Sequence, residues 1–410
     1  MILIIRLSWR SIWRNKRRTG ITVLSIGFGL ALAIFFISVA EGVYTRLIDQ
    51  VARTTSGHVA LEHPGYQEAP AVDLYVENAG PLAREFASWP EVSSVKPLVL
   101  GQGMAKSGAG SLGAAIMGVD PAVERATSPL PGNIREGDYL SPGDAALVVI
   151  GRGMAEQLNL AVGKKMVLAT NDTQGNLVEE LCRVKGIFVT GSEELDSYFI
   201  QAPMGFAAGL FGLPAGAVTR MGLVLKKAGD QEDILARANR LVAGKGLAVL
   251  PWQEVLPEVA SYIRMDKSSN WIFQGILIFI VLFTIFNTLL MSVLERGAEF
   301  AVLLAIGTRP WQVRAQVFFE SLFLGLMGSL AGLALGGGLS LLVNRVGIDL
   351  ASLLKEGLTV SGFAIDTRIH AAFTVAGLLL PTALVFGATL VLSLIPMRRA
   401  AGVSVADAMR

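Results

Sequence analysis

Four long apolar runs constrain this chain more than any other feature. They cover residues 21–43, 271–294, 317–342 and 373–395, and each is long enough to cross a bilayer as one helix, which takes about 20 residues. The segment 44–267, between the first two runs, is charged and rich in Gly and Pro, so it is too polar to lie in a membrane. A composition of 52% hydrophobic and 17% charged residues fits this mixture. The pattern predicts a membrane protein with four transmembrane α-helices and a large domain inserted between the first and second helices.

The inserted segment carries signals for both strands and helices. Alternating residues predict a strand over 92–105, and the apolar run 145–151 predicts a buried strand that leads into a helix over 152–160. Two strand-like runs flank the turn from Asn171 to Asn176, which is typical of a hairpin. A further helix is predicted over 231–243. This mixture predicts an α+β domain, in one lobe or in two.

Charge is distributed unevenly, although the net charge is only +2. Three segments at the two ends and after the second run hold 12 basic and 3 acidic side chains, and the rest of the chain is acidic overall. Basic segments that flank transmembrane helices stay in the cytoplasm, so both chain ends are predicted inside and the inserted domain outside. The predicted segments are a cytoplasmic or interfacial stretch 1–20, helix 21–43, the periplasmic domain 44–267, helix 271–294, the cytoplasmic loop 295–316, helix 317–342, the short periplasmic loop 343–369, helix 373–395 and the cytoplasmic tail 396–410.

The N-terminal stretch leaves two interpretations open. Arginines together with Trp9 and Trp13 suit a helix at the inner membrane interface, and they equally suit an ordinary basic flank. The run 21–43 could itself be a secretory signal, because Ser38-Val39-Ala40 resembles a cleavage site. Its length exceeds the roughly 7–15 apolar residues of such a signal, so a transmembrane helix is the preferred interpretation.

Motifs for catalysis are missing from the sequence. It has no GxxxxGK[ST] loop for nucleotide phosphates, no HExxH or CxxC, and no GxSxG. Cys182 lies in a strand-like run and is interpreted as a core residue, while Glu41 and Glu320 lie near the ends of apolar runs and are interpreted as interfacial or capping residues. The chain is therefore predicted to be no enzyme, with no cofactor of its own, so that any ATP chemistry comes from a partner.

Polar residues inside the apolar runs are few. Ser25 and Ser38 occur in the first run, Asn287 and Thr288 in the second, and no charged track crosses the bilayer. An ion channel, a proton-coupled transporter or a hydrophilic pore needs polar groups along its route. A cargo is therefore expected to be amphipathic or to be handled outside the membrane.

A second apolar patch, residues 300–306, follows the second long run and is too short to span a membrane. Gly307 and Thr308 interrupt it, and Pro310 fits the first turn of a new helix behind a Thr cap. Such a patch must be covered by the membrane surface, by a neighbouring helix or by a pocket in another protein. The last of these is the preferred interpretation.

The third apolar run carries Gly328, Gly332 and Gly336 at steps of four, beside a parallel ridge of Ser321, Gly325 and Ser329. Small residues at this spacing let helix backbones approach closely in lipid. Glycine is also simply frequent in membrane helices. Close helix packing is the preferred interpretation.

Three segments resemble FtsX-like permeases of bacterial ABC transporters. They are the basic entry LSWRSIWRNKRRTGITVLSI, the segment MSVLERGAEFAVLLAIGTRPWQVRAQVFFES and the ending IPMRRAAGVSVADAMR, in which Met409 stands where leucine is more usual. The order of one span, a large external domain and three further spans is similar as well. Within the family, the chain is most similar to the lipoprotein-releasing, Lol-type permeases.

The resemblance implies a bacterial inner-membrane permease that works with a cytoplasmic ABC ATPase dimer, a second permease subunit and membrane lipids. It also implies a periplasmic lipoprotein carrier and no nucleic acid. ATP and Mg would be bound by the ATPase, whose hydrolysis would move the external domains and release a lipoprotein or similar amphiphile. The residues that would contact the ATPase are Glu295, Arg296, Glu299, Phe300, Leu303, Leu304, Gly307 and Arg309.

Three other functions remain open at this stage. The chain could transmit force across the membrane to activate a cell-wall hydrolase, as the cell-division branch of the family does. It could also export a drug or another small amphiphile. Finally, it could be a structural membrane anchor that binds no ATPase.

Overall fold

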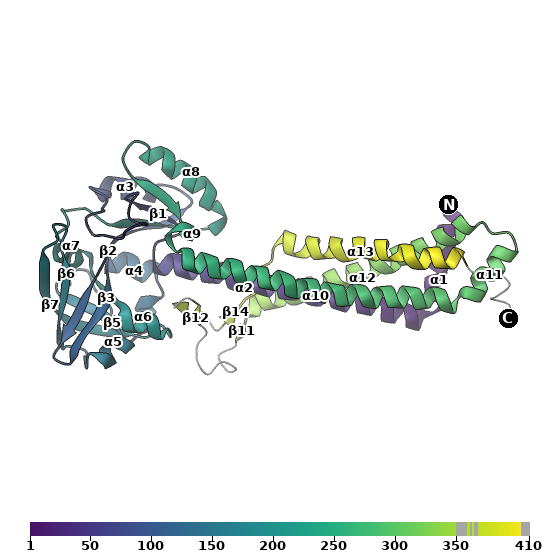
Figure 1. Cartoon of the computed structure of the whole chain (residues 1–410), viewed down its shortest axis with the longest axis horizontal. Coiled ribbons are helices and arrows are strands. Elements are labelled where there is room, and N and C mark those ends of the chain that lie inside the picture. The colour runs from purple at the N-terminus through teal and green to yellow at the C-terminus, as the bar shows by residue number, and fades with distance from the viewer. Residues whose placement is uncertain (350–358, 361–362, 365–367, 403–410) are drawn as a thin grey trace. The chain divides into compact units, whose positions relative to one another are not determined.

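The computed structural model describes residues 1–349, 359–360, 363–364 and 368–402 (Figure 1). It divides into two compact units, which we call the helical unit and the sheet unit. The helical unit comprises Met1–Thr45, Met265–Leu350 and Arg368–Arg410, and the sheet unit comprises Arg46–Arg264 and Ala351–Thr367. Four helices among the described residues are long and apolar enough to cross a membrane, and a mixed α+β domain is inserted between the first and second, as predicted.

The helical unit is built from long helices and one short strand pair. Strand β11 pairs with β14 in antiparallel fashion. Helices α2 and α10 each contribute residues to both units. The elements are α1 (Ile2–Arg14), α2 (Lys16–Thr54), α10 (Pro257–Glu295), α11 (Gly297–Ala305), α12 (Pro310–Val346), β11 (Ile348–Asp349), β14 (Arg368–Ile369) and α13 (Val375–Ala401).

The boundaries of these helices differ from the predicted spans. Helix α12 begins at Pro310, so the second part of the predicted loop 295–316 is already helical. Its N-cap is Arg309 rather than Thr308, and the Gln312 side chain accepts a hydrogen bond from the Arg309 N–H at 2.9 Å. Helix α13 begins at Val375, two residues later than predicted, because the Thr374 hydroxyl accepts from the Gly377 N–H at 3.1 Å and caps it. Side-chain capping of this kind is hard to locate from apolar run length alone.

The glycine ridge of α12 packs against α2. A Cβ built on Gly328 would lie 2.6 Å from Ile26 Cβ, and one on Gly332 would lie 2.7 Å from Leu30 Cβ. Gly336 approaches α2 in the same way, since its Cβ would lie 2.8 Å from Ala31 Cα. These contacts show the close approach expected of the ridge and name its partner helix.

The neighbouring small-residue ridge of α12 meets a different helix. A Cβ on Gly325 would lie 3.2 Å from Thr389 Cγ2 of α13. Ile26, Leu30 and Ile34 of α2 then pack with side chains of α10 and α13 in one apolar core. Helix α12 thus offers one ridge to α2 and one to α13.

We predict that Gly332→Ala destabilises the helical unit although alanine favours a helix. The added methyl needs α2 and α12 to separate, which costs about 1–3 kcal/mol when a packed interface is overfilled. The measurement is thermal unfolding of the full chain in detergent. Gly338→Ala on the same helix is the matched control, because nothing lies within 4 Å of its Cβ position. Equal melting temperatures for the two variants would contradict the prediction.

The sheet unit is organised on a ten-stranded sheet with the order β10-β1-β9-β2-β3-β8-β5-β7-β4, in which β6 pairs with both β2 and β7. The strands β2, β3, β8, β5, β7 and β6 therefore form a closed circuit. The strands are β1 (Val59–Glu62), β2 (Val92–Ser107), β3 (Gly110–Val119), β4 (Ile134–Gly137), β5 (Leu147–Gly151), β6 (Lys165–Asn171), β7 (Leu177–Phe188), β8 (Phe199–Pro203), β9 (Arg220–Leu225) and β10 (Ala248–Pro251). A separate short pair joins β12 (Thr359–Val360) and β13 (Phe363–Ala364).

Three apolar clusters of described residues support this sheet, and the third packs around Leu98, Tyr139 and Phe188. Inside the closed circuit pack residues such as Ile150, Leu168 and Ile200, and under β1, β9 and β10 pack Phe86 and Trp89. The sheet is continuous, but its core is divided. The helices that cover it are α3 (Ala79–Ala87), α4 (Pro121–Thr127), α5 (Arg152–Gln157), α6 (Glu193–Tyr198), α7 (Met204–Leu210), α8 (Gln231–Val242) and α9 (Trp252–Val255), with 3-10 turns at Leu130–Asn133 and Ala228–Asp230.

The interpretation of Cys182 as a core residue is confirmed. Its side chain is buried inside the closed circuit on β7. Burial raises the pKa of the thiol to about 12, so almost none of it is thiolate at neutral pH. The predicted hairpin is also present, with β6 and β7 paired from Lys165↔Arg183 to Asn171↔Leu177.

A buried ion pair ties β2 to α4 and to the end of α2. Lys96 and Glu124 lie 2.8 Å apart, and each side chain is only 1% exposed. The Lys96 ammonium also donates to the Arg53 carbonyl at 2.6 Å, in the last turn of α2. Glu124 in turn accepts from Gln201 Nε2 at 3.2 Å. Burial lowers the pKa of Lys96, while Glu124 acts against that shift.

We predict that Lys96→Met destabilises the sheet unit by about 3–5 kcal/mol, because it leaves the Glu124 carboxylate buried without its cation. The free energy of unfolding of the full chain in detergent, from chemical denaturation, measures the effect. Lys106→Met is the control on the same strand, since the Lys106–Glu179 pair is exposed and should contribute at most about 1 kcal/mol. A similar decrease in the free energy of unfolding for both variants would contradict the stabilising role of the Lys96–Glu124 pair.

Candidate functional site

The candidate site lies where α10, α11 and α12 follow one another in the helical unit. Helix α10 ends at Glu295, Arg296 makes the turn, and α11 runs from Gly297 to Ala305. Gly307 then has a φ of +96°, a backbone conformation that a residue with a Cβ rarely adopts. The two bends present α11 as a short helix between two long ones.

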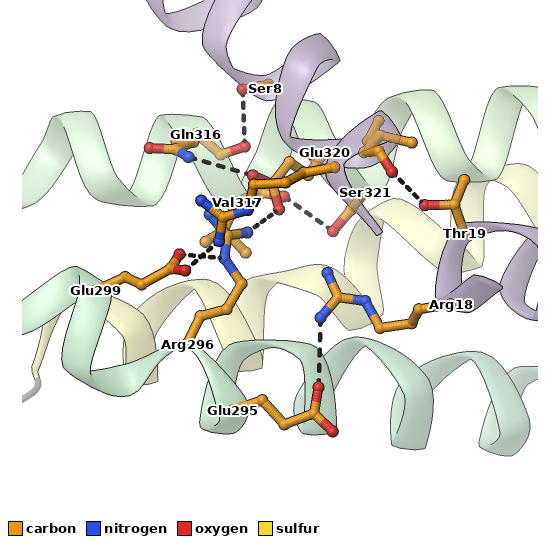
Figure 2. Close-up of polar contacts among 12 residues, drawn as sticks. Ser8, Arg18, Thr19, Glu295, Arg296, Glu299, Gln316, Val317, Glu320 and Ser321 are labelled. Atoms are coloured by element: carbon orange, nitrogen blue, oxygen red, sulfur yellow. Dashed lines mark hydrogen bonds and ion pairs between the residues drawn. The ribbon is translucent and has the colours of Figure 1, made fainter. Parts of the chain in front are cut away.

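Arg296 is the centre of this arrangement (Figure 2). Its guanidinium donates from Nη1 to Glu320 Oε2 at 2.7 Å and from Nε to Glu299 Oε2 at 3.0 Å. The Arg296 side chain is 10% exposed, and it lies over the Phe300 ring at 4.9 Å. Gln316 Nε2 donates to the other oxygen of Glu320 at 3.2 Å. One arginine thus joins the turn, α11 and α12.

The pKa values in this cluster show how tightly it is paired. Burial alone would lower the pKa of Arg296, but Glu320 and Glu299 outweigh it, and the pKa is raised. Burial alone would raise the pKa of Glu299, but hydrogen bonds from Arg296 and Arg14 hold it below its usual range. Arg296 and Glu299 are therefore both charged at neutral pH.

The N-terminal helix packs onto the same region. Arg14 of α1 forms an ion pair with Glu299, and Arg18, in the first turn of α2, lies 3.4 Å from Glu295. The Ser8 hydroxyl donates to the Gln316 carbonyl at 3.1 Å. Helix α1 is therefore bound to α11 through Arg14 and to α12 through Ser8, and Figure 2 shows the contact of Ser8 with Gln316.

Some residues of the apolar patch 300–306 are buried in a core of the helical unit, and others are exposed on its surface. Phe300 and Ala301 are buried and pack in one core with Val313 and Val317 of α12 and Ala400 of α13. Leu303 and Leu304 are half-buried against that core.

Phe300 and Arg296, two of the residues expected to contact a partner, are covered in this structure by the chain's own helices. Phe300 is 0% exposed and Arg296 is 8% exposed. The side chains that face outward are Val302, 52% exposed, and Ile306, 74% exposed, with Trp311 at the start of α12. Glu295, Glu299, Gly307 and Arg309 are exposed as well.

A groove runs between α1 and α11. Trp9, Trp13 and Arg10 line it from α1, and Ala298 and Val302 line it from α11. Beside it, the Trp9 ring meets Phe323 of α12 edge-to-face, with ring centroids 5.2 Å apart. The groove and the exposed side of α11 make one continuous surface of arginines, aromatic rings and aliphatic side chains.

Sequence reasoning missed the residues that hold this surface. Glu320 was interpreted as interfacial or capping, but it is the buried partner of Arg296. Arg14 and Gln316 were not singled out, although both bind the cluster. The signal in the sequence was weak: a carboxylate in an apolar run has to be paired, and the pairing spans 24 positions along the chain. The tail 403–410, part of the ending that resembles the family, lies outside the described residues.

The described residues include no group of three or more His, Cys, Asp or Glu side chains placed to hold a metal ion. The charged residues of the site pair with one another instead. What the site offers is a binding surface on a short helix and a rigid set of ion pairs behind it.

Comparison with known protein families shows which family this chain belongs to. A MacB-like periplasmic core domain matches residues 19–241, more than half of the chain, and the C-terminal part of FtsX-like permeases matches residues 271–405. The chain is an FtsX-like permease with a MacB-like periplasmic core domain. The candidate site falls inside the FtsX-like part.

Two kinds of transporter are among the relatives of this permease. The lipoprotein-releasing system transmembrane protein LolC of Neisseria meningitidis is 24% identical, over 97% of this chain and 96% of its own length. The pyoverdine export ATP-binding/permease protein PvdT of Pseudomonas syringae is 26% identical over 84% of this chain, which spans only 53% of that protein. The periplasmic region of MacB from Actinobacillus actinomycetemcomitans is 13% identical and covers 49% of this chain and 92% of its own, with a TM-score of 0.35.

Membership in this family makes the chain an ABC transporter permease of the bacterial inner membrane. Permeases of this kind are not enzymes, and the family implies a partner ATPase and a dimeric arrangement.

We predict that the ion pairs of Glu299 stabilise the permease in a pH-dependent way. Because the pKa of Glu299 is depressed in the folded state, the stabilisation is present above about pH 4.5 and is lost as the pH falls through the depressed value. Glu299→Gln should therefore lower stability at neutral pH, by up to about 1 kcal/mol for so exposed a pair, and the difference from wild type should vanish in acid.

Thermal unfolding in detergent at a series of pH values measures this difference. Glu85→Gln, an exposed carboxylate on α3, is the control and should differ from wild type by the same small amount at every pH. A Glu299→Gln difference that does not depend on pH would contradict the prediction.

Proposed function

We propose that this permease couples ATP hydrolysis by a separate cytoplasmic ATPase to the release of a lipoprotein, or a similar amphiphile, from the inner membrane. The observation that carries the proposal is the similarity to LolC, which extends over 97% of this chain and 96% of LolC. The sequence itself contains no GxxxxGK[ST] loop, so ATP and Mg would be bound by the partner.

The positive-inside rule supports the orientation. Helix α1, the turn at Arg296 and the end of α13 at Arg398 and Arg399 are basic, so they lie in the cytoplasm with both chain ends. The sheet unit then lies in the periplasm, and α11 faces the compartment in which ATP is available.

Helix α11 is the ATPase-docking element in this proposal. Its exposed residues, Val302 and Ile306, would enter a pocket of the ATPase, with Arg309 and Glu295 at the rim. Leu303 and Leu304 would support that contact from their half-buried positions. The partner is an ATPase dimer bound by two permease subunits, identical or different.

The buried residues have a different role. Arg296 and Phe300 do not touch the ATPase; they fix α11 against α12 and α13. Because Arg296 binds Glu320 of α12 and Glu299 binds Arg14 of α1, a displacement of α11 would move those helices with it. In this way a cytoplasmic event would reach the membrane helices.

We predict that Val302→Asp together with Ile306→Asp abolishes co-purification of the ATP-binding subunit from native membranes. Two charges in an apolar pocket would be desolvated without partners. The fold should survive, because both side chains are exposed in the permease itself. Ile2→Asp is the control, since Ile2 is 72% exposed on α1 and does not line the groove between α1 and α11. Retention of the ATPase by the double variant would refute this docking surface.

A depletion experiment tests the cargo. Removing the permease from cells should leave at least one lipoprotein in the inner membrane, as measured by membrane fractionation. Unchanged sorting of every lipoprotein would sink the proposal for lipoprotein release. Loss of cell-wall hydrolase activity instead would favour the force-transmitting alternative.

Export of a small amphiphile is the second candidate. The similarity to PvdT over 84% of this chain favours it. The same depletion strain distinguishes the two, because an exporter would leave lipoprotein sorting intact and would change the extracellular concentration of a small molecule.

A further inference from the structure

A second cavity lies in the helical unit, away from α11. Three helices, α2, α10 and α13, form its walls. On α10 the residues Lys267, Asn270, Trp271 and Gln274 line it, at the i, i+3, i+4 and i+7 spacing of one helix face. Nothing in the proposed docking of an ATPase uses these residues.

The cavity changes character along its length. At one end Lys267 forms an ion pair with Glu41 of α2 at 3.4 Å, and its ammonium lies over the Tyr44 ring at 5.0 Å. Two turns further along α10, the walls become apolar, with Ile37 of α2 and Leu380 of α13. A cavity that is charged at one end and apolar at the other matches an amphiphile, whose polar head and hydrocarbon chain need these two environments.

Gln274 stands out at the apolar end. It is 3% exposed, and within the described part of the chain neither its Nε2 nor its Oε1 has a hydrogen-bond partner. Leaving a buried amide unpaired is costly, so such a residue is kept where something else pairs with it. A ligand bound in the cavity that Gln274 lines could form the missing hydrogen bonds.

We propose that this cavity binds the acylated head of a lipid-like ligand and that Gln274 recognises its acyl carbonyl. The Gln274 NH2 group would donate to an ester or amide carbonyl, and the acyl chain would lie along Ile37 and Leu380. The ion pair of Lys267 and Glu41 would face the polar head. This proposal rests on the proposed function and narrows it. It states that the permease recognises the ester or amide linkage between the polar head and the acyl chain of its ligand.

Two sources carry this chemistry, a bilayer phospholipid and the lipid anchor of a lipoprotein. The ester linkage of a phospholipid offers acceptors only, and so it would satisfy only the donors of Gln274. An acylated polypeptide also offers an N–H, which Gln274 Oε1 could accept. The anchor of a lipoprotein can therefore form hydrogen bonds with both Nε2 and Oε1 of Gln274, whereas the ester linkage of a phospholipid with the same chains can bind only Nε2.

The test is a binding titration of the purified full chain in detergent. A spin-labelled lipid quenches the fluorescence of Trp271, which lines the cavity, and a Trp271→Phe variant supplies the background from the other tryptophans. Three competitors are compared: a diacyl phospholipid, its dialkyl ether analogue without carbonyls, and a synthetic diacylglyceryl lipopeptide of matched chain length.

Wild type should prefer the diacyl compound over the ether by about three- to tenfold, which corresponds to one hydrogen bond between neutral groups. Gln274→Leu, of similar size, should bind both equally, and Gln274→Asn should keep part of the preference. Phe279→Leu is the control on the same helix, where Phe279 is 67% exposed, and it should behave as wild type. The lipopeptide should compete better than the phospholipid.

Equal binding of ester and ether by wild type, or a preference that survives in Gln274→Leu, would overturn the role of Gln274. Absence of saturable competition by all three compounds would overturn the cavity itself. Better competition by the phospholipid would overturn the lipoprotein anchor as the ligand. None of these outcomes depends on an ATPase, so they are distinguishable from a failure of the sorting experiment, which would remove the proposed function alone.

Discussion

The charge of Arg296 holds α10, α11 and α12 of the helical unit together. A buried guanidinium is costly unless carboxylates surround it, and Glu320 and Glu299 supply them from two different helices. Because Glu320 cannot leave Arg296 without stranding a buried charge, the turn before α11 is held against α12, and the more exposed Glu299 adds a weaker contact from α11 itself. The same ion pairs connect α11 to its neighbours. In the proposed coupling, a force applied to the exposed side of α11 would reach α12 through Glu320 and α1 through Arg14.

The sequence was sufficient for the features that depend on composition. Apolar run length predicts the four membrane helices, because the hydrocarbon core of a bilayer is of fixed thickness, and residue alternation predicts strands such as β2 and the β6–β7 hairpin. The spacing of Gly328, Gly332 and Gly336 indicates a close helix contact, but it could not say that the partner is α2.

Features that depend on long-range pairing could not be predicted in this way. The patch 300–306 looked like a single docking surface, since its residues are all apolar, yet the fold turns Phe300 inward and Ile306 outward. Which residue faces which way depends on the angle between α11 and α12, and that angle depends on Arg296 and Glu320. The unpaired amide of Gln274 is equally invisible in a sequence, because any glutamine in an apolar helix could have found a partner.

The closed circuit of strands in the sheet unit has a consequence for how such domains can meet. The circuit pairs β2, β3, β8, β5, β7 and β6 with neighbours on both sides over part of each strand. The two strands that end the described sheet are β10 and β4, and each is four residues long. Short terminal strands are poor templates for pairing with another chain. Two copies of the domain, or a domain and a carrier, would therefore touch through side chains on its faces and loops. Contacts of that kind can form and separate in every transport cycle, whereas a sheet shared between two chains would tend to persist.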